Sequence, residues 1–286
     1  MELKLFNDNF LNINIKEIPP INLVITSPPY NLSIRYDEWD DAMPYPLYKD
    51  FCKQWIKKLY DCMAPDGRIA INIPFSVTPE NDNKDNTDGE WLNYPLIADY
   101  INIALDSGFN FWRIITWDKN MSNKTCWGSW KSARCPFLRD PSEAIIVLYK
   151  KQWKRIDEGK STITGKEFLS LTKNLWKMHP ETQSKHPAAF PLELPMNCMK
   201  LFSYENDWVM DNFMGSGTTG EAAMLLRRNF VGVEISSDYF KDAKHRIESA
   251  KFSQEKQDLL FDPVDIPDEP EPTLDNVQET GIISPQ

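Results

Sequence analysis

A glycine-rich loop with the sequence NFMGSGTTG lies at residues 212–220, between a short apolar segment that ends at Asp211 and a predicted helix. Glycines at such a turn let the backbone approach a ligand closely, and the helix start presents N–H groups to it. Glu234 ends the next apolar segment, where a carboxylate accepts hydrogen bonds from ribose hydroxyls. We expect this region to bind a cofactor that contains a nucleoside.

The spacing within this region does not by itself identify the cofactor. Gly215, Gly217 and Gly220 followed by Glu234 also form the fingerprint of dinucleotide-binding domains. An NAD-dependent oxidoreductase is therefore one interpretation, and a tight turn without a ligand is another. Two features favour S-adenosyl-L-methionine (SAM): the unit lies near the C-terminus with Phe213 before its first glycine, and a second loop suited to chemistry lies far upstream.

The upstream loop is TSPPYN, residues 26–31, directly after a β-branched apolar segment. Two successive prolines fix φ at about −65° and lack N–H groups, so the loop is stiff and its carbonyls remain available as acceptors. The exocyclic amine of a nucleobase is a poor nucleophile because its lone pair is delocalised. Hydrogen bonds from this amine to Ser27 and to the Pro28 carbonyl would favour a pyramidal nitrogen that attacks a methylsulfonium carbon in line.

Tyr30 is expected to stack on the target base, which must leave the double helix to be reached. A proline-rich turn without a chemical role is the alternative for Pro28 and Pro29 taken alone. No cysteine follows the proline pair, and Cys62 and Cys198 lie outside both loops. Methylation of a ring carbon through a covalent cysteine adduct is therefore not expected.

The hydrophobic pattern shows which elements must position these loops. It predicts strands at residues 21–27, 68–73, 111–117, 143–149, 208–211 and 229–235, and helices at 45–63, 94–107, 220–227 and 238–250. This alternation predicts an α/β fold with a mostly parallel, doubly wound sheet. Residues 78–90 are a predicted loop, and a lysine-rich segment up to about residue 185 is expected to be weakly structured. We assign residues 1–254 to one catalytic domain and residues 255–286 to an acidic, disordered tail.

The net charge of −10 is concentrated in this tail, which holds nine acidic residues and one lysine. Between Arg113 and Lys177, fourteen basic residues stand against six acidic ones and alternate with tryptophans. This pattern is compatible with a stripe that faces nucleic-acid phosphates, whereas composition alone favours a solvated surface with core tryptophans. The cysteines and histidines lack metal-ligand spacing, so neither zinc nor disulfides are expected. No segment has the length of a membrane span or the pattern of a signal peptide, so we expect a cytoplasmic protein.

The two loops carry a resemblance to a known family. TSPPYN resembles the catalytic motif of amino-methyltransferases, and DNFMGSGTTGEAA (211–223) resembles their SAM-binding motif. With the catalytic loop first and the cofactor loop last, the chain resembles the β group of bacterial DNA amino-methyltransferases of the restriction-modification type. HPAAFPLELP (186–195) and residues 127–150 are similar to further segments of these enzymes. The resemblance implies a Rossmann-like, SAM-dependent methyltransferase fold in permuted motif order, with SAM as cofactor and double-stranded DNA as partner.

The resemblance also implies roles for single residues. The implied catalytic residues are Ser27, Pro28, Pro29 and Tyr30, and the implied cofactor residues are Asp211, Phe213, Gly215, Ser216, Gly217, Thr218, Glu234, His186 and Phe190. Recognition of the DNA target is expected within residues 118–185, at Trp127, Trp130, Lys131, Arg134 and Arg139. Asn212 departs from the proline that these enzymes often have before the phenylalanine.

The position of Ser27 bears on the choice of base. N4-cytosine enzymes of this kind commonly have serine there, and N6-adenine enzymes commonly have aspartate, so Ser27 favours cytosine while adenine stays open. A DNA-binding protein that has the fold but no activity is a further alternative. The sequence decides neither whether a cognate restriction endonuclease exists nor whether the chain forms a homodimer.

Overall fold

The computed structural model describes residues 1–32, 41–79, 92–120, 129, 131–136, 138–181 and 190–260, with side chains up to residue 257. Within these residues, no helix is long and apolar enough to cross a membrane. The elements are β1 (Leu3–Asn7), the 3-10 turns η1 (Phe10–Asn12) and η2 (Ile15–Glu17), β2 (Ile21–Thr26), α1 (Tyr45–Cys62), β3 (Met63–Ile73), α3 (Leu96–Asp106), β4 (Asn110–Asp118), β5 (Ser142–Tyr149), α4 (Gly165–Leu171), β6 (Leu175–Lys177), α5 (Glu193–Phe202), β7 (Trp208–Asp211), α6 (Thr218–Leu225), β8 (Asn229–Glu234) and α7 (Ser237–Leu260).

The strands form one sheet of eight, in the order β1-β8-β7-β2-β3-β5-β4-β6. Strand β5 runs antiparallel to β3 and β4, and the remaining neighbours are parallel. From β2 the chain continues outward to β3, and it later returns on the other side of β2 with β7 and β8. The strand order therefore reverses between β2 and β7, and such a point is where open α/β sheets bind ligands, beyond the carboxyl ends of the strands.

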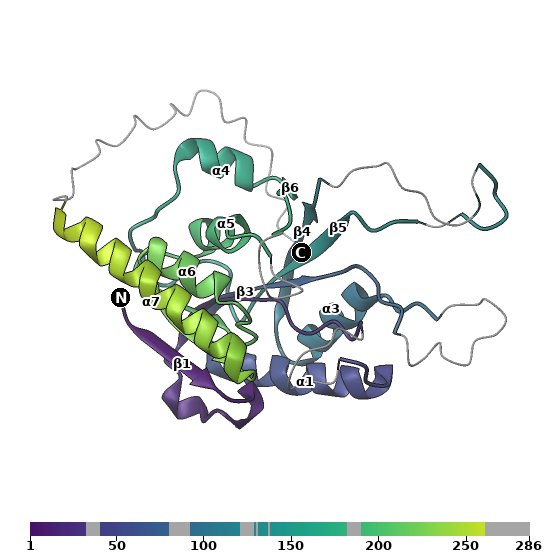
Figure 1. The fold of residues 1–286 in the computed structure, drawn as a ribbon, viewed down its shortest axis with the longest axis horizontal. Coiled ribbons are helices and arrows are strands. Elements are labelled where there is room, and N and C mark those ends of the chain that lie inside the picture. Colours follow the sequence, from purple (N-terminus) through teal and green to yellow (C-terminus); the bar gives the residue numbers. More distant parts are fainter. Residues whose placement is uncertain are drawn as a thin grey trace.

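Helices cover both faces of this sheet, as Figure 1 shows. Helices α1 and α3 pack on one face, where Trp55 and Tyr100 are buried together with Ile71 of β3. Helices α5, α6 and α7 pack on the other face and bury Leu194 and Ile247. The central strands are therefore apolar on both sides, which explains why β2 and β3 have continuous apolar runs instead of alternating ones.

The fold class and the strands and helices predicted from the hydrophobic pattern are confirmed, and the structure differs from the prediction at β1, α4, α5, β6 and α7. Residues 3–7, for which no element was predicted, form β1 at the sheet edge beside β8. The lysine-rich segment contains α4 and β6, and a capping box of Thr164 and Glu167 starts α4. Helix α7 continues ten residues beyond the predicted end at Ala250 and so extends into the segment assigned to the tail. A Lys251–Glu255 ion pair, 3.8 Å long with i,i+4 spacing, supports this extension.

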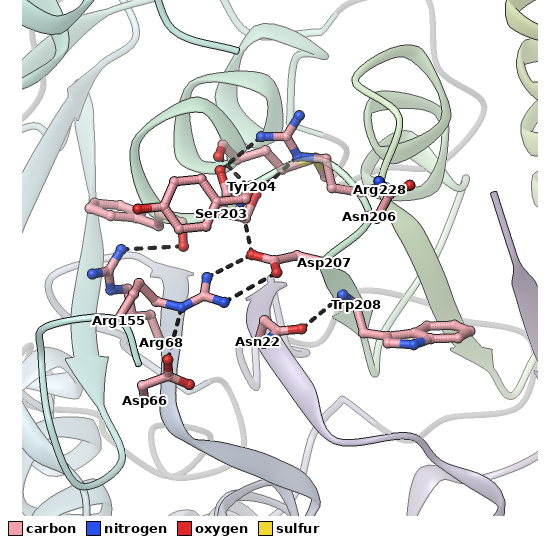
Figure 2. A network of polar contacts seen from close by, with 12 residues as sticks. Asn22, Asp66, Arg68, Arg155, Ser203, Tyr204, Asn206, Asp207, Trp208 and Arg228 are labelled. Carbon is pink, nitrogen blue, oxygen red and sulfur yellow. Dashed lines mark hydrogen bonds and ion pairs between the residues drawn. The ribbon is translucent and has the colours of Figure 1, made fainter. Parts of the chain in front are cut away.

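A polar network braces the central strands at their amino-terminal ends (Figure 2). The Arg155 guanidinium binds both oxygens of the Asp207 carboxylate, at 2.6 and 3.1 Å, and donates from Nε to Asp66 at 3.0 Å. Asp66 belongs to β3 and Asp207 directly precedes β7, so one arginine joins the strands on either side of β2. Bidentate pairs of this kind fix geometry as well as adding energy. The loops at the opposite, carboxyl ends of β2 and β7 therefore start from fixed strands.

Candidate active site

The TSPPYN loop and the glycine loop lie side by side because their strands, β2 and β7, are neighbours. Asp211, the last residue of β7, accepts hydrogen bonds from Thr26 Oγ1 at 2.9 Å and from Thr219 Oγ1 at 2.7 Å. The backbone N–H of Phe213 donates to the same carboxylate at 3.1 Å. One buried carboxylate thus fastens the end of β2, the glycine loop and the first turn of α6.

Burial raises the pKa of the Asp211 carboxyl to about 6, although the hydrogen bonds from Thr219, Thr26 and Phe213 favour its charged form. The folded protein therefore holds this proton more tightly than the unfolded chain between about pH 4 and 6, and ionisation destabilises the fold. We expect the unfolding free energy of the protein, relative to Asp211→Asn, to fall by up to about 3 kcal/mol as pH rises from about 4 to 7.

Denaturant unfolding of both proteins across this pH range measures that difference. Asp50→Asn, at an exposed position on α1, is the matched control for loss of a surface carboxylate. If the unfolding free energy of the native protein, relative to Asp211→Asn, rises with pH, then burial is not the dominant influence on the pKa of Asp211.

The two hydroxyl groups of the catalytic loop contact each other, with Ser27 Oγ and the Tyr30 hydroxyl oxygen 2.5 Å apart. The Tyr30 hydroxyl donates to the backbone carbonyl of Asn72, at the end of β3, over 3.2 Å. A phenol has one proton, so in this arrangement Ser27 is the donor to Tyr30 and its oxygen keeps lone pairs for an external donor. Within the described residues, no donor reaches the Pro28 carbonyl either. Both acceptors assigned to the amine therefore keep lone pairs that no described donor occupies.

The Pro29 carbonyl, in contrast, is already bound, contrary to the expectation that the loop's carbonyls remain available. The Tyr48 hydroxyl on α1 donates to it at 2.9 Å, and the Tyr48 and Tyr100 hydroxyls lie 2.8 Å apart. Cys52 Sγ donates to the Tyr100 hydroxyl at 3.3 Å, and all three side chains are fully buried. Since Tyr48 and Tyr100 lie on α1 and α3, these two helices set the position of the loop.

The loop ends at Asn31, which has a left-handed backbone conformation with φ of 61°. Its side-chain amide exchanges two hydrogen bonds with the Met43 backbone, each 2.8 Å long. The Asp41 carboxylate accepts from the backbone N–H groups of Asn31 and Leu32 at 2.8 and 2.9 Å. Both ends of the proline pair are thus anchored, which keeps the loop rigid before any ligand binds.

Replacing Tyr48 with phenylalanine is expected to lower kcat about tenfold, because a loop shifted by a fraction of an ångström misdirects the attacking atom. The SAM dissociation constant should stay within about twofold, since the hydroxyl that is removed binds Pro29 and Tyr100 and not the glycine loop. Single-turnover rates and calorimetric titration with SAM measure the two quantities. Tyr45→Phe is the matched control, because the Tyr45 hydroxyl on the same helix binds Asp99 at 2.7 Å instead of the loop. Equal losses in the two variants would indicate that helix stability, not loop position, is affected.

The glycine loop is held by Glu234, at the end of β8. Glu234 Oε2 accepts from the Gly215 backbone N–H at 2.7 Å, and Oε1 accepts from the Ser236 N–H at 2.9 Å. Gly217 has φ of 80°, and a Cβ there would lie 2.9 Å from Ala243 Cβ of α7. The structural requirement for Gly217 is therefore close packing against a helix in addition to a left-handed turn.

Ser216 and Thr218, two further predicted cofactor residues, have their hydroxyl oxygens 3.3 Å apart. Arg246 on α7 donates to Thr218 Oγ1 at 3.1 Å and forms an ion pair with Glu221. The Thr218 hydroxyl, assigned to the cofactor carboxylate, thus lies next to a cation that the sequence did not place there.

A cavity of about 50 Å³ adjoins the glycine loop and is lined by Asn212, Phe213 and Glu234 together with Phe10 of the N-terminal segment. The Phe213 ring is fixed edge-on by Trp55, with ring centroids 5.3 Å apart. An aromatic ring and a carboxylate are groups that bind the flat face of a base and the ribose hydroxyls of a nucleoside. The residues of this cavity therefore fit a nucleoside cofactor.

A larger cavity of about 710 Å³ lies beside the TSPPYN loop, a volume typical of ligand sites. Tyr30 and Asn72 line it, and so does Phe190, which therefore lies with the catalytic loop and not beside Glu234. The wall also contains Trp117 and the Lys119–Glu143 ion pair. This cavity has the size and the aromatic lining that a base outside its helix requires.

The two cavities do not account for every predicted site residue. His186, Trp127 and Trp130 lie outside the described residues. Lys131, Arg134 and Arg139 are exposed and do not line the larger cavity. Trp117 and Trp176, in the basic stripe, are buried, so for these two tryptophans the core interpretation is correct.

The structure adds residues to the site that sequence reasoning did not single out. Asn72 could have been recognised, because it is the polar residue within the otherwise apolar end of its strand, residues 69–73. Tyr48 and Thr26 gave no such signal, since their partners Pro29 and Asp211 become neighbours only in the fold. These three residues position the loops that the sequence identified.

The sheet with its two adjacent loops can now be compared with known proteins. The DNA methylase family model N6_N4_Mtase matches residues 21–245. The Type II methyltransferase M.MjaVI of Methanocaldococcus jannaschii is 40% identical over 184 residues, covering 64% of this chain and 89% of the relative. M2.DpnII of Streptococcus pneumoniae is 24% identical over 264 residues, covering 85% and 88%. The chain therefore belongs to the DNA methylase family of N6 and N4 amino-methyltransferases.

Solved structures agree with this assignment. A putative DNA modification methylase of Thermus thermophilus, in complex with SAM, has a TM-score of 0.68 and 25% identity, covering 86% of this chain and 93% of its own. The cytosine-N4-specific PvuII DNA methyltransferase has a TM-score of 0.64 and 19% identity, covering 90% and 92%, which shows a shared fold. Family membership excludes the oxidoreductase interpretation of the glycine loop.

Proposed function

We propose that this protein is a site-specific DNA methyltransferase that transfers the methyl group of SAM to the exocyclic amine of a base outside its helix, with N4 of cytosine as the target. The observation that carries the proposal is the Asp211 junction. Its bonds to Thr26 and Thr219 hold the amine-binding loop and the nucleoside-binding loop at adjacent strand ends.

In this proposal the cofactor lies along the glycine loop, with Glu234 receiving the ribose hydroxyls and Phe213 contacting the adenine ring. SAM supplies an activated methyl group on a sulfonium. The cofactor of the neighbouring Thermus thermophilus structure and the family membership of the chain support this assignment. Each carboxylate oxygen accepts about two hydrogen bonds, so Glu234 can hold Gly215 and Ser236 and still receive ribose hydroxyls.

The residues of the catalytic loop orient the amine. Its two N–H groups donate to Ser27 Oγ and to the Pro28 carbonyl, which directs the nitrogen lone pair away from the base ring and toward the methyl donor. The rigid anchoring of the loop at Tyr48 and Asn31 means that little order must be gained when the base arrives. Tyr30 stacks on the base within the larger cavity.

The preference for cytosine rests on Ser27, because N4-cytosine enzymes of this kind commonly have serine at this position. The Ser27 hydroxyl donates to Tyr30, so its oxygen keeps lone pairs for the amine. An aspartate at this position would add a negative charge beside Tyr30. Adenine N6 presents the same amine chemistry, so the identity of the base is decided by experiment.

The test is incubation of the purified protein with methyl-labelled SAM and mixed genomic DNA, followed by mass spectrometry of the digested nucleosides. We expect labelled N4-methylcytosine. Labelled N6-methyladenine would keep the enzyme class and overturn the choice of base. No labelled nucleoside together with no SAM binding would reject the proposal and favour a DNA-binding protein without activity.

A further inference from the structure

Asn212, between Asp211 and Phe213, has a buried side-chain amide without a hydrogen-bond partner among the described residues. The residue is 2% exposed, and neither its Nδ2 nor its Oδ1 atom is paired within this part of the chain. A buried amide that lacks partners destabilises a fold, and nearly all such groups in proteins are paired. The unpaired amide of Asn212 is therefore explained better by a ligand that pairs with it than by the stability of the fold.

Other buried asparagines near the site show what ordinary pairing looks like. The Asn31 amide is satisfied at both atoms by the Met43 backbone, and Asn72 Nδ2 donates to the Ala144 carbonyl at 3.3 Å. Asn212 differs from both because no described residue pairs with its amide and because the residue lines the small cavity together with Phe213 and Glu234. The unpaired amide therefore belongs to a residue in the wall of the site that the proposed function assigns to the cofactor.

The chemistry of the amide identifies the part of the ligand it fits. Ribose hydroxyls are the partners of the Glu234 carboxylate, and the flat face of a base is the partner of the Phe213 ring, which leaves the edge of the base. An amide presents one donor and one acceptor side by side, and this pair matches the adenine edge, where the 6-amino donor adjoins a ring nitrogen acceptor. A narrow cavity of about 50 Å³ admits such an edge more readily than a whole nucleoside.

We propose that the Asn212 amide binds the amino edge of the cofactor's adenine ring and makes the site selective for a 6-aminopurine. This rests on the proposed function, which supplies the cofactor, and it assigns the determinant of base selectivity to this chain's own asparagine. The position is the one where the family that the sequence resembles often has proline, which has no donor to offer a ligand.

The first measurement is calorimetric titration with S-adenosyl-L-homocysteine and with its analogue whose purine lacks the 6-amino group. The native protein should prefer the amino form by roughly tenfold, because the analogue leaves the Asn212 oxygen unpaired. In Asn212→Leu, which keeps the side-chain size, this preference should shrink to within about twofold. Asn197→Leu, at a buried asparagine of α5 that does not line the cavity, is the matched control and should keep the native preference.

The second measurement is the unfolding midpoint of each protein without ligand. Asn212→Leu should unfold at a higher denaturant concentration than the native protein, because the substitution removes a buried unpaired amide. Weaker selectivity together with higher stability is the combination that a ligand-binding amide predicts. Lower stability with unchanged selectivity would show that Asn212 is structural and would overturn the inference.

The proposed function and this inference can fail separately. If the native protein binds S-adenosyl-L-homocysteine but does not distinguish the two purines, the inference is wrong and the proposed function stands. If the native protein binds neither ligand, the proposed function is rejected, and the inference that rests on it is rejected with it.

Discussion

Replacing Tyr30 with alanine is expected to reduce kcat for methyl transfer by about 100-fold or more, because stacking of a base on an aromatic ring contributes roughly 1–3 kcal/mol and the loop also loses a contact. That contact is the link from Ser27 Oγ through the Tyr30 hydroxyl to the Asn72 carbonyl. SAM affinity should remain within about twofold, since Tyr30 lines the larger cavity and not the one beside Glu234. Single-turnover rates with labelled SAM and direct titration with SAM measure both effects.

Tyr30→Phe separates the two roles of this residue. Phenylalanine keeps the stacking surface but removes the hydroxyl that accepts from Ser27, so the Ser27 proton is no longer directed away from the amine. We expect an intermediate loss of about tenfold in kcat for this variant, with DNA affinity unchanged. Loss of SAM binding in Tyr30→Ala would count against the stacking role, and a phenylalanine variant as inactive as the alanine variant would assign the whole effect to the hydroxyl.

The sequence was sufficient to locate the two loops because each follows a short apolar run that is typical of a buried strand. Segments 21–27 and 208–211 were predicted as strands, and β2 and β7 occupy almost these residues. The hydrophobic pattern did not predict that β2 and β7 are neighbours, because periodicity indicates burial and not which strands pair. The Thr26–Asp211 hydrogen bond joins residues 185 positions apart. Threonine and aspartate are both common at the ends of strands, so neither residue type indicates this contact.

Because hydrophobic periodicity does not record which segments pair, the prediction also missed some elements and the direction of one strand. Strand β1 is short, lies at the sheet edge and alternates weakly, so its pairing with β8 rather than its own composition makes it a strand. Strand β5 was correctly located, yet its antiparallel direction depends on the connection from β4, which periodicity does not record. Helix α4 was hidden in a lysine-rich stretch, although the Thr164–Glu167 capping box was present in the sequence. Local signals thus identified elements, and contacts between distant residues decided their arrangement.

The glycines of the cofactor loop have a packing role that the sequence motif did not indicate. The sequence pattern suggested that Gly217 and Gly220 allow a ligand to approach the backbone. In the fold, a Cβ on Gly217 would contact Ala243, and a Cβ on Gly220 would contact Ile247, both of α7. These glycines therefore let α6 and α7 pack closely, and the backbone N–H of Gly215 is the group of the loop that Glu234 holds.

Replacing Glu234 with alanine is expected to weaken SAM binding by about 100-fold, because two roles of one carboxylate are lost together. The first is its proposed acceptance of ribose hydroxyls. The second is its hold on the Gly215 and Ser236 backbone N–H groups, at 2.7 and 2.9 Å, without which the glycine loop loses its shape. Titration with SAM measures the affinity, and unfolding without ligand measures the loss of loop contacts.

Glu234→Gln distinguishes the two roles, because glutamine keeps the side-chain shape but has one acceptor oxygen where glutamate has two. Its amide nitrogen must then face either Gly215 or Ser236, so we expect a loss of about tenfold in affinity and a smaller loss in stability than for alanine. Glu248→Ala is the matched control, since Glu248 is an exposed carboxylate on α7 that pairs with Lys244 and not with the loop backbone. Native SAM affinity in Glu234→Ala would show that the ribose is bound elsewhere, whereas a stability loss with native affinity would restrict Glu234 to holding the loop.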